Sequence, residues 1–246
     1  MKKSLIIISL LGLCLVGCSD SQSEHTNNHE DSHSHDGSHD HGDSHEGHEG
    51  HHSMGTLPLE KRVAFMSGHV EAGLALYRAG KPEQAAQHLL HPVSETHQAE
   101  RAGIDSLGFK PDLFKSVSKA LDAGRPASEI EPMLVEAEEN ITLLQKNSGG
   151  DVVELITFLM EKVDEEYNAG VSDGMIVEAG EYQDAFGFSI VALKMAKRME
   201  GDKAASLIEE ASKLVSMWPE IGPLADSKPT PAEEVVNQAN KVVEQL

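Results

Sequence analysis

Residues 58–80 read PLEKRVAFMSGHVEAGLALYRAG, and this stretch sets the pattern for the rest of the folded chain. Proline at its start and glycine at its end are typical of the two ends of an α-helix. Phe65 and Gly73 lie four residues before and after His69, so the three share one helix face. Because the residues around them on that face are apolar, we expect His69 to point into a protein core.

The same proline and glycine punctuation continues to the C-terminus. No alternating β-branched runs bounded by turns indicate strands. We therefore predict an all-α fold, a helical bundle of about 8–9 helices preceded by a disordered His-rich tail, with the helical domain at residues 57–246. The expected helices span residues 58–79, 82–91, 92–106, 111–123, 126–146, 151–168 and 176–199, followed by one ending near Met217 and one from Pro231 onward.

The first residues have the layout of a secretory signal. Lys2 and Lys3 precede an apolar run from Leu5 to Val16, too short to cross a membrane. The ending Leu15-Val16-Gly17-Cys18 resembles the bacterial lipobox, which implies a signal peptide at 1–17 and lipidation of Cys18. Ser19 resembles the outer-membrane sorting pattern, so we expect anchoring at the periplasmic side of the outer membrane. The alternatives are the inner membrane, an uncleaved anchor or an ordinary signal cut elsewhere.

Residues 18–56 are polar and rich in histidine and acid, without lysine or arginine. Such a segment cannot bury enough apolar surface to order, so we predict a disordered tether. Imidazole is a common ligand of late first-row metals, so we predict loose metal binding. The alternative is a hydrophilic spacer. The predicted tail ligands are His25, His29, His33, His35, His39, His41, His45, His48, His51 and His52.

The formal net charge of −21 limits the partners of this chain. Strong negative charge repels nucleic acid and anionic lipid, and it favours cations. We therefore expect no nucleic-acid partner and membrane contact only through the lipid anchor.

A second group of candidate metal ligands lies inside the helical domain. His88 and His91 are three residues apart, and Glu95 follows His91 by four. Helical bundles build metal sites from inward-facing His and Glu on neighbouring helices, and a helical hairpin would bring His69 near this group. The alternative is that these are core histidines, with His91 capping a helix.

Acidic residues further along can supply oxygen ligands. Glu178, Glu181 and Asp184 fall near one helix face, and Asp173 precedes them.

Two resemblances to known families carry further expectations. His97-Gln98-Ala99-Glu100 resembles the HxxE motif of imelysin-like periplasmic proteins, a helical family associated with iron uptake. The stretch from Tyr167 to Phe188 resembles the extracytoplasmic helical region of bacterial high-affinity iron permeases. It matches at Tyr167, Val171, Asp173, Gly174, Glu181, Tyr182 and Phe188. This second resemblance implies a helical module of metal-uptake systems without transport itself, because the permease's membrane helices are absent.

No catalytic motif is evident, whether nucleophile elbow, phosphate loop or HExxH, so we do not expect an enzyme. The favoured function is a lipid-anchored periplasmic protein that binds transition metal and assists its capture, buffering or uptake, with an envelope metal transporter as a partner. Zinc is the favoured ion, with nickel, copper and iron as alternatives. The alternative function is a helical interaction module of the cell envelope, with the tail as a spacer.

Overall fold

The computed structural model describes residues 57–94, 98 and 101–246, all within the unit His48–Leu246. The predicted signal peptide, Cys18 and the histidine tail lie outside the described residues, as do Glu95, His97 and Glu100. The all-α prediction is confirmed. The helices are α1 (Leu59–Arg78), α2 (Pro82–Leu90), α3 (Pro111–Asp122), α4 (Ala127–Ser148), α5 (Val152–Gly170), α6 (Ala179–Ala196), α7 (Ala204–Val215) and α8 (Ala232–Val243).

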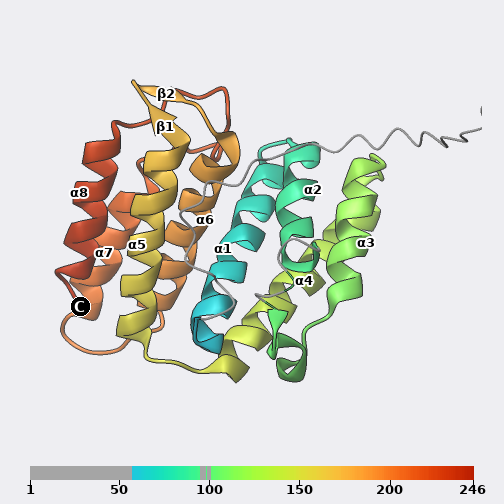
Figure 1. Ribbon diagram of the computed structural model, residues 1–246, viewed down its shortest axis with the longest axis horizontal. Helices are drawn as coiled ribbons and strands as arrows, with labels where there is room; N and C mark the ends of the chain where they lie inside the picture. Colours follow the sequence, from blue (N-terminus) through green and yellow to red (C-terminus); the bar gives the residue numbers. More distant parts are fainter. Residues whose placement is uncertain (1–56, 95–97, 99–100) are drawn as a thin grey trace, which may run out of the picture. The chain divides into compact units, whose positions relative to one another are not determined.

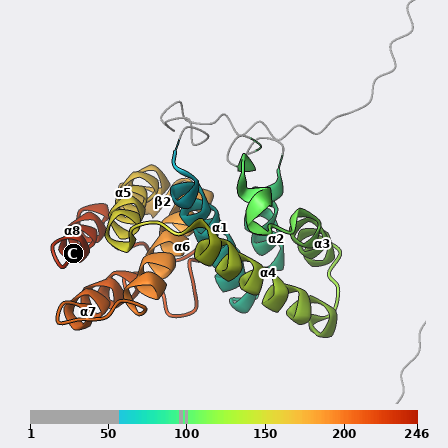
Figure 2. The same ribbon diagram turned by 90° about the horizontal axis from the view of Figure 1, so that it is seen from below.

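The helices form two halves that meet at α1 and α6. Figures 1 and 2 show α2, α3 and α4 on one side of this pair and α5, α7 and α8 on the other. We call α1–α4 the N-terminal half and α5–α8 the C-terminal half. Each half has its own hydrophobic cluster, and α1 contributes to both, with Leu76 in the first and Phe65 in the second.

Two glycines allow α1 and α6 to approach each other closely. A Cβ atom on Gly187 would lie 2.1 Å from the carbonyl oxygen of Gly68. A Cβ atom on Gly68 would lie 2.1 Å from the ring of Phe188. A side chain at Gly187 would meet the backbone of α1, and one at Gly68 would meet the buried Phe188 ring, so the close crossing depends on glycine at both positions.

An aromatic cluster fills the C-terminal half. The Trp218 ring packs at centroid distances of 5.2 Å from Tyr167, 6.0 Å from Tyr182 and 5.7 Å from Phe186. Its indole Nε1 donates a hydrogen bond to the carbonyl of Tyr182 at 3.3 Å. Burying this polar group with a partner lets a large ring pack in the core at little cost. The N-terminal half relies mainly on aliphatic side chains.

The helix predicted over residues 92–106 is wrong in the described part of that segment. The described residues there form two short 3₁₀ turns, η2 (His91–Val93) and η4 (Ile104–Leu107). Gly103 and Gly108 flank the second turn with φ of 85° and 95°. These left-handed conformations end a right-handed helix, and glycine adopts them without steric cost.

A small hairpin separates α5 from α6, in the segment between the helices expected over residues 151–168 and 176–199. Strand β1 (Val171–Ser172) pairs antiparallel with β2 (Met175–Ile176). The turn residues Asp173 and Gly174 have φ of 51° and 72°, which is the Asp-Gly pattern of two-residue hairpins. Consequently α6 begins at Ala179 and not at residue 176, and it ends before Met199.

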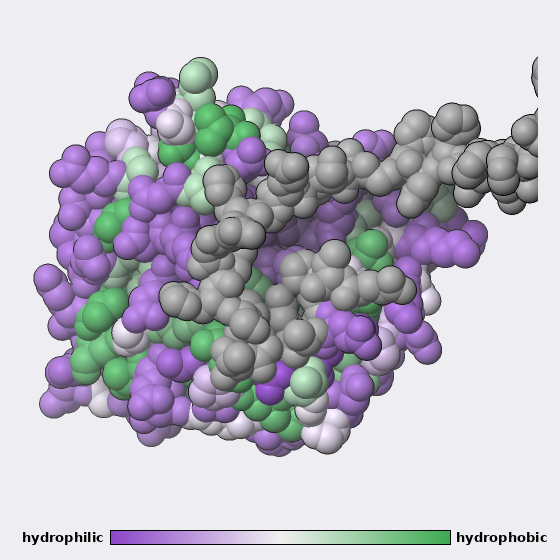
Figure 3. All heavy atoms as spheres, in the orientation of Figure 1, coloured by the Kyte–Doolittle hydropathy of each residue, from purple (hydrophilic) through white to green (hydrophobic). Residues whose placement is uncertain are grey.

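The surface of the described part is largely hydrophilic in the view of Figure 3, in keeping with the net charge. Apolar colour gathers at the top of this view, near the hairpin, where Met175 is 62 % exposed and Val177 is 50 % exposed. Among the described residues, no helix has the length and apolar character needed to cross a membrane.

Candidate metal centre

Three buried side chains from three helices converge where the two halves meet. They are His69 on α1, His88 on α2 and Asp184 on α6. One ligand atom from each lies within 4.8 Å of the others, and the residues are 2 %, 7 % and 8 % exposed. Two imidazoles and a carboxylate at this spacing can share one metal ion.

Close helix packing holds these side chains together. The crossing of Gly68 and Gly187 brings α1 against α6, one residue from His69 and three from Asp184. Gly73 has the same effect between α1 and α2, because a Cβ there would lie 2.8 Å from the Leu89 side chain. The small residues that flank the site therefore set how near its ligands come.

Both histidines contact the same carboxylate oxygen. His69 Nδ1 lies 2.6 Å from Asp184 Oδ1, and His88 Nδ1 lies 3.0 Å from that atom. A carboxylate oxygen only accepts hydrogen bonds, so both ring nitrogens donate here. The shared use of Oδ1 leaves the other oxygen, Oδ2, for a further partner.

Two glutamines fix the orientation of His88. Its Nε2–H donates to Gln183 Oε1 at 2.8 Å, and Gln183 Nε2 donates in turn to Gln84 Oε1 at 2.9 Å. Metal-binding histidines commonly donate their second N–H to a carbonyl or carboxylate in this way. The chain of amides aims the Nδ1 atom of His88 at Asp184.

The electrostatics of the site keep its carboxylate charged. Burial alone would raise the pKa of Asp184, but the charges and hydrogen bonds of His69 and His88 outweigh it and hold the pKa well below its usual range. Burial would likewise lower the pKa of His88, but the contact with Asp184 raises it overall. The site therefore holds a charged, hydrogen-bonded pair away from solvent.

His69 carries the unsatisfied atom of the cluster. Its Nε2 is buried and has no hydrogen-bond partner among the described residues. His91 stacks on the His69 ring at a centroid distance of 3.5 Å and an angle of 16°, while Phe65 packs edge-on at 4.6 Å. A buried polar atom without a partner costs about 1–3 kcal/mol, and such atoms mark sites where a ligand is expected.

The donor set suits a late first-row divalent metal. Two imidazoles and one carboxylate are ligands for zinc, nickel, copper(II) or ferrous iron, whereas calcium and magnesium prefer all-oxygen sites. Zinc bonds of about 2.0–2.1 Å place neighbouring tetrahedral ligands about 3.3 Å apart. The present 2.6 and 3.0 Å contacts to Asp184 are shorter than that spacing, so a metal would have to replace the bridging protons and move these ligand atoms apart.

The predicted ligands of the domain are only partly brought together. His69 and His88 lie in the group, whereas His91 stacks beside it, and Glu95 lies outside the described residues. Asp184 was expected only as one of several oxygen donors on another segment. Of those others, Asp173 and Glu178 are exposed, and Glu181 is half-buried one turn before Asp184.

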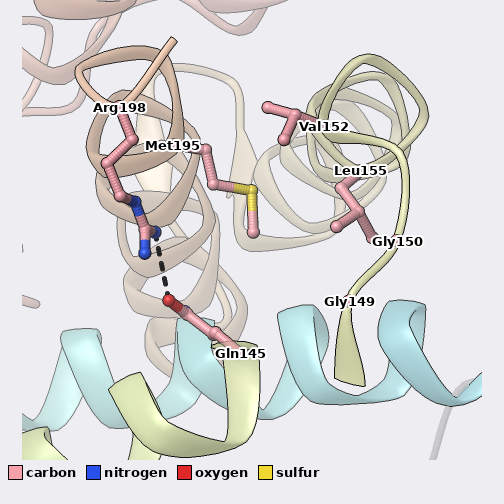
Figure 4. Close-up of a pocket in the computed structure, with 7 residues that line it drawn as sticks. All are labelled: Gln145, Gly149, Gly150, Val152, Leu155, Met195 and Arg198. Atoms are coloured by element: carbon pink, nitrogen blue, oxygen red, sulfur yellow. Dashed lines mark hydrogen bonds between the residues drawn. The ribbon is translucent and has the colours of Figure 1, made fainter. Parts of the chain in front are cut away.

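Two hollows elsewhere lack comparable chemistry. One, of about 220 Å³, is lined mostly by apolar side chains such as Val152, Leu155 and Met195. Figure 4 shows its polar edge, where Arg198 Nη2 donates to Gln145 Oε1 at 3.1 Å. The other, of about 470 Å³, lies between the β1–β2 turn and residues 228–233. Neither contains a cluster of metal-ligating side chains like that formed by His69, His88 and Asp184.

The C-terminal half contains the Tyr167–Phe188 stretch and its four packed helices. Residues 144–246 match the iron permease-associated 4-helix bundle domain. This match confirms the resemblance to the extracytoplasmic region of iron permeases and extends it to α5–α8. No curated protein and no solved structure matches the chain. The matched region contains Asp184 and Gln183, but His69, His88 and Gln84 precede it, so the candidate metal centre draws on both halves.

Proposed function

We propose that this chain is a lipid-anchored periplasmic protein that binds a divalent transition metal and assists its uptake. The observation that carries the proposal is the buried group of His69, His88 and Asp184, in which one ligand atom from each side chain lies within 4.8 Å of the others. Buried charged groups are costly unless they are paired or hold a ligand.

The histidine-rich tail is assigned the role of capture. Its ten histidines and interspersed acids offer many weak coordination modes, so it collects ions with little selectivity. The resemblance of Leu15–Cys18 to the lipobox supports a position of this tail beside the outer membrane, with the inner membrane as the alternative. The domain then supplies one defined site, whose geometry limits which metal is retained.

The match of residues 144–246 supports a role beside a metal transporter, because that domain is described as iron permease-associated. The match also supports iron as a candidate ion, besides zinc, nickel and copper. Binding without catalysis agrees with the chain's lack of known catalytic motifs.

The test separates the domain from the tail in the full chain. The ten histidines of residues 25–52 are replaced by asparagine, which gives a tail-silenced chain of unchanged length. Zinc is titrated into this chain by calorimetry, and we expect one equivalent to bind with micromolar or tighter affinity, about −8 kcal/mol or more favourable. His88→Gln should weaken that binding by about 100-fold, since it removes a direct ligand.

The exposed Gln87→Ala on the same helix serves as the control and should bind as the parent does. If zinc binds the tail-silenced chain no better than about millimolar, the buried group is structural and the proposal fails.

A helical interaction module is the second candidate, and the apolar hairpin favours it. Met175 in β2 and Val177 just after it are 62 % and 50 % exposed. Exposed apolar patches of this kind often mark protein contacts. Absence of metal binding in both the natural and the tail-silenced chain would make this the better account.

A further inference from the structure

The hollow of about 220 Å³ lies where the end of α4, the start of α5 and the end of α6 meet. Its wall is apolar, and Figure 4 shows Met195 of α6 facing Val152 and Leu155 of α5 across the open space. Met195 and Leu155 are buried, whereas Val152 in the first turn of α5 is 38 % exposed. Sites for drug-sized molecules typically measure about 300–1,000 Å³, so this hollow suits a smaller ligand.

Arg198 provides the polar edge of this hollow, and hydrogen bonds hold its guanidinium in place. Its Nε donates to the carbonyl of Lys194 at 3.1 Å, and its Nη2 donates to Gln145 Oε1 at 3.1 Å. Gln145 is held in turn, because its Nε2 donates to Oγ of the buried Ser67 at 2.9 Å. A guanidinium carries five N–H donors, and these two bonds leave the other three for a ligand.

The positive charge of Arg198 has no carboxylate partner among the described residues, since both of its hydrogen bonds go to neutral oxygen atoms. Lys194, one turn earlier, shows the contrasting arrangement. Its Nζ lies 2.6 Å from a carboxylate oxygen of Glu71 and 2.9 Å from one of Glu138. The charge at the edge of the hollow is therefore not neutralised by the protein around it, and it favours a ligand that brings a negative charge.

We propose that this hollow binds a small molecule with one carboxylate and an apolar body, such as an aromatic or short-chain monocarboxylate. The guanidinium of Arg198 binds the carboxylate oxygens, because its planar fork of N–H groups matches their geometry. The apolar body lies against Met195, Val152 and Leu155, which removes apolar surface from water. The site shares no residue with the His69–His88–Asp184 group, so the proposal does not depend on metal binding.

The surroundings of the hollow limit the ligand to one negative charge. Arg198 is the only charged residue among the described residues that line it. Acidic groups lie close by, because Asp151 follows the lining residue Gly150, and a Cβ atom on Gly150 would lie 2.8 Å from Cγ of Glu60. A second carboxylate on the ligand would meet these acids without a second cation, so a dicarboxylate should bind more weakly than a monocarboxylate.

The experiment uses a probe group inside the hollow. The methionine methyl groups of the full chain are labelled with carbon-13, and the nuclear magnetic resonance signal of Met195 is assigned by its loss in Met195→Leu. Benzoate is then titrated in the presence of a metal chelator. We expect a saturable shift of the Met195 signal with a Kd of about 1 mM, whereas the signal of the exposed Met175 in β2 stays in place. Benzamide, which is neutral, and phthalate, which has two carboxylates, should bind about tenfold more weakly or worse.

Three variants test the assignment, with circular dichroism as the check that each is folded. Arg198→Gln should weaken benzoate binding by about tenfold or more, and Val152→Phe should block it by filling the hollow. The matched control Lys197→Gln removes an exposed positive charge that does not line the hollow, and it should bind benzoate as the parent does. The proposal is overturned if benzoate does not shift the Met195 signal, if benzamide binds as tightly as benzoate, or if Arg198→Gln and Lys197→Gln have equal effects. Unchanged binding in Val152→Phe would also overturn it.

Discussion

The N-terminal half offers nitrogen ligands and the C-terminal half offers oxygen ligands. His69 and His88 come from the first half, whereas Asp184 comes from the second. The match to the iron permease-associated domain covers the second half and only the last turn of α4 from the first. The comparison shows that a match to a known domain can describe half of a site, with the remaining ligands supplied by helices packed against it.

The largest expected effect comes from removing the carboxylate at the centre of this arrangement. Asp184→Asn leaves two buried imidazoles without their common charged partner, and losing one member of a buried pair costs about 3–5 kcal/mol. Urea denaturation in the presence of a chelator measures the free energy of unfolding. Asp173→Asn, in the exposed hairpin turn, is the control and should leave that free energy nearly unchanged. An equal effect of the two changes would contradict a special role for Asp184.

The pH dependence of stability tests the buried carboxyl group of Glu166 on α5. Burial, followed by the hydrogen bond and negative charge of Glu181, raises the pKa of Glu166 to about 10. Glu166 thus keeps its proton in the folded state and loses it near its ordinary pKa when unfolded, so rising pH favours unfolding. The loss is at most about 1.4 kcal/mol per pH unit between those two pKa values.

Glu166→Gln should remove most of this loss, and its stability advantage over the parent should grow from pH 5 to pH 8. Urea midpoints with chelator present measure it, and the exposed Glu161→Gln provides the reference. A constant difference across this range would show that Glu166 ionises normally.

The contact between the two halves is tested at Gly187. Gly187→Ala places a Cβ against the backbone of Gly68, and overpacking typically costs about 1–3 kcal/mol, more than the helix propensity that alanine gains. Gly180→Ala on the same helix meets no atom within 4 Å and should be neutral or stabilising. Thermal unfolding of both variants decides the matter. A stabilising Gly187→Ala would mean that α1 and α6 are not held this closely.

The smallest expected effect comes from removing the hydrogen bond between Gln183 and Gln84, which holds Gln183 against His88. Gln84→Ala leaves the His88 nitrogens intact but removes the acceptor that holds Gln183 in place. Loss of such an outer partner typically weakens metal binding by about 10–100-fold, and we expect the lower end because Gln183 remains. Zinc calorimetry on the tail-silenced chain measures this loss. Unchanged affinity would show that Gln183 needs no such support.

Helix positions were predictable where proline and glycine mark the ends. The helices starting at Pro82 and Pro111 begin as expected, and Asp151 caps α5 through hydrogen bonds to the backbone of Val153 and Glu154. The helix over residues 92–106 was predicted wrongly because proline is common at the first position of a helix, as Pro92 would be. The hairpin was not predicted because its strands are only two residues long, although Asp173-Gly174 is a strong turn signal.

Of the candidate site, the sequence predicts the buried position of His69 but not its contact with Asp184. Helical spacing placed His69 inward, and it is 2 % exposed. Spacing along the chain does not reveal which distant residue will meet it, and Asp184 lies 115 residues away. His69 reaches Asp184 because α1 and α6 pack closely where Gly68 and Gly187 cross, and that close packing is possible because neither glycine has a side chain. Helical spacing predicts which face of a helix is buried, but it does not predict which distant residue packs against that face.

The single tryptophan provides a natural optical probe of one half alone. Trp218 lies within the aromatic cluster of Tyr167, Tyr182 and Phe186, and the chain has no other tryptophan. Its fluorescence therefore follows the melting of α5–α8, whereas far-ultraviolet circular dichroism follows all helices together. Coincident transitions would show that the two halves unfold as one cooperative unit. Separate transitions would show that the two halves unfold independently. Added metal should then bring the two midpoints together, because it binds residues from both halves.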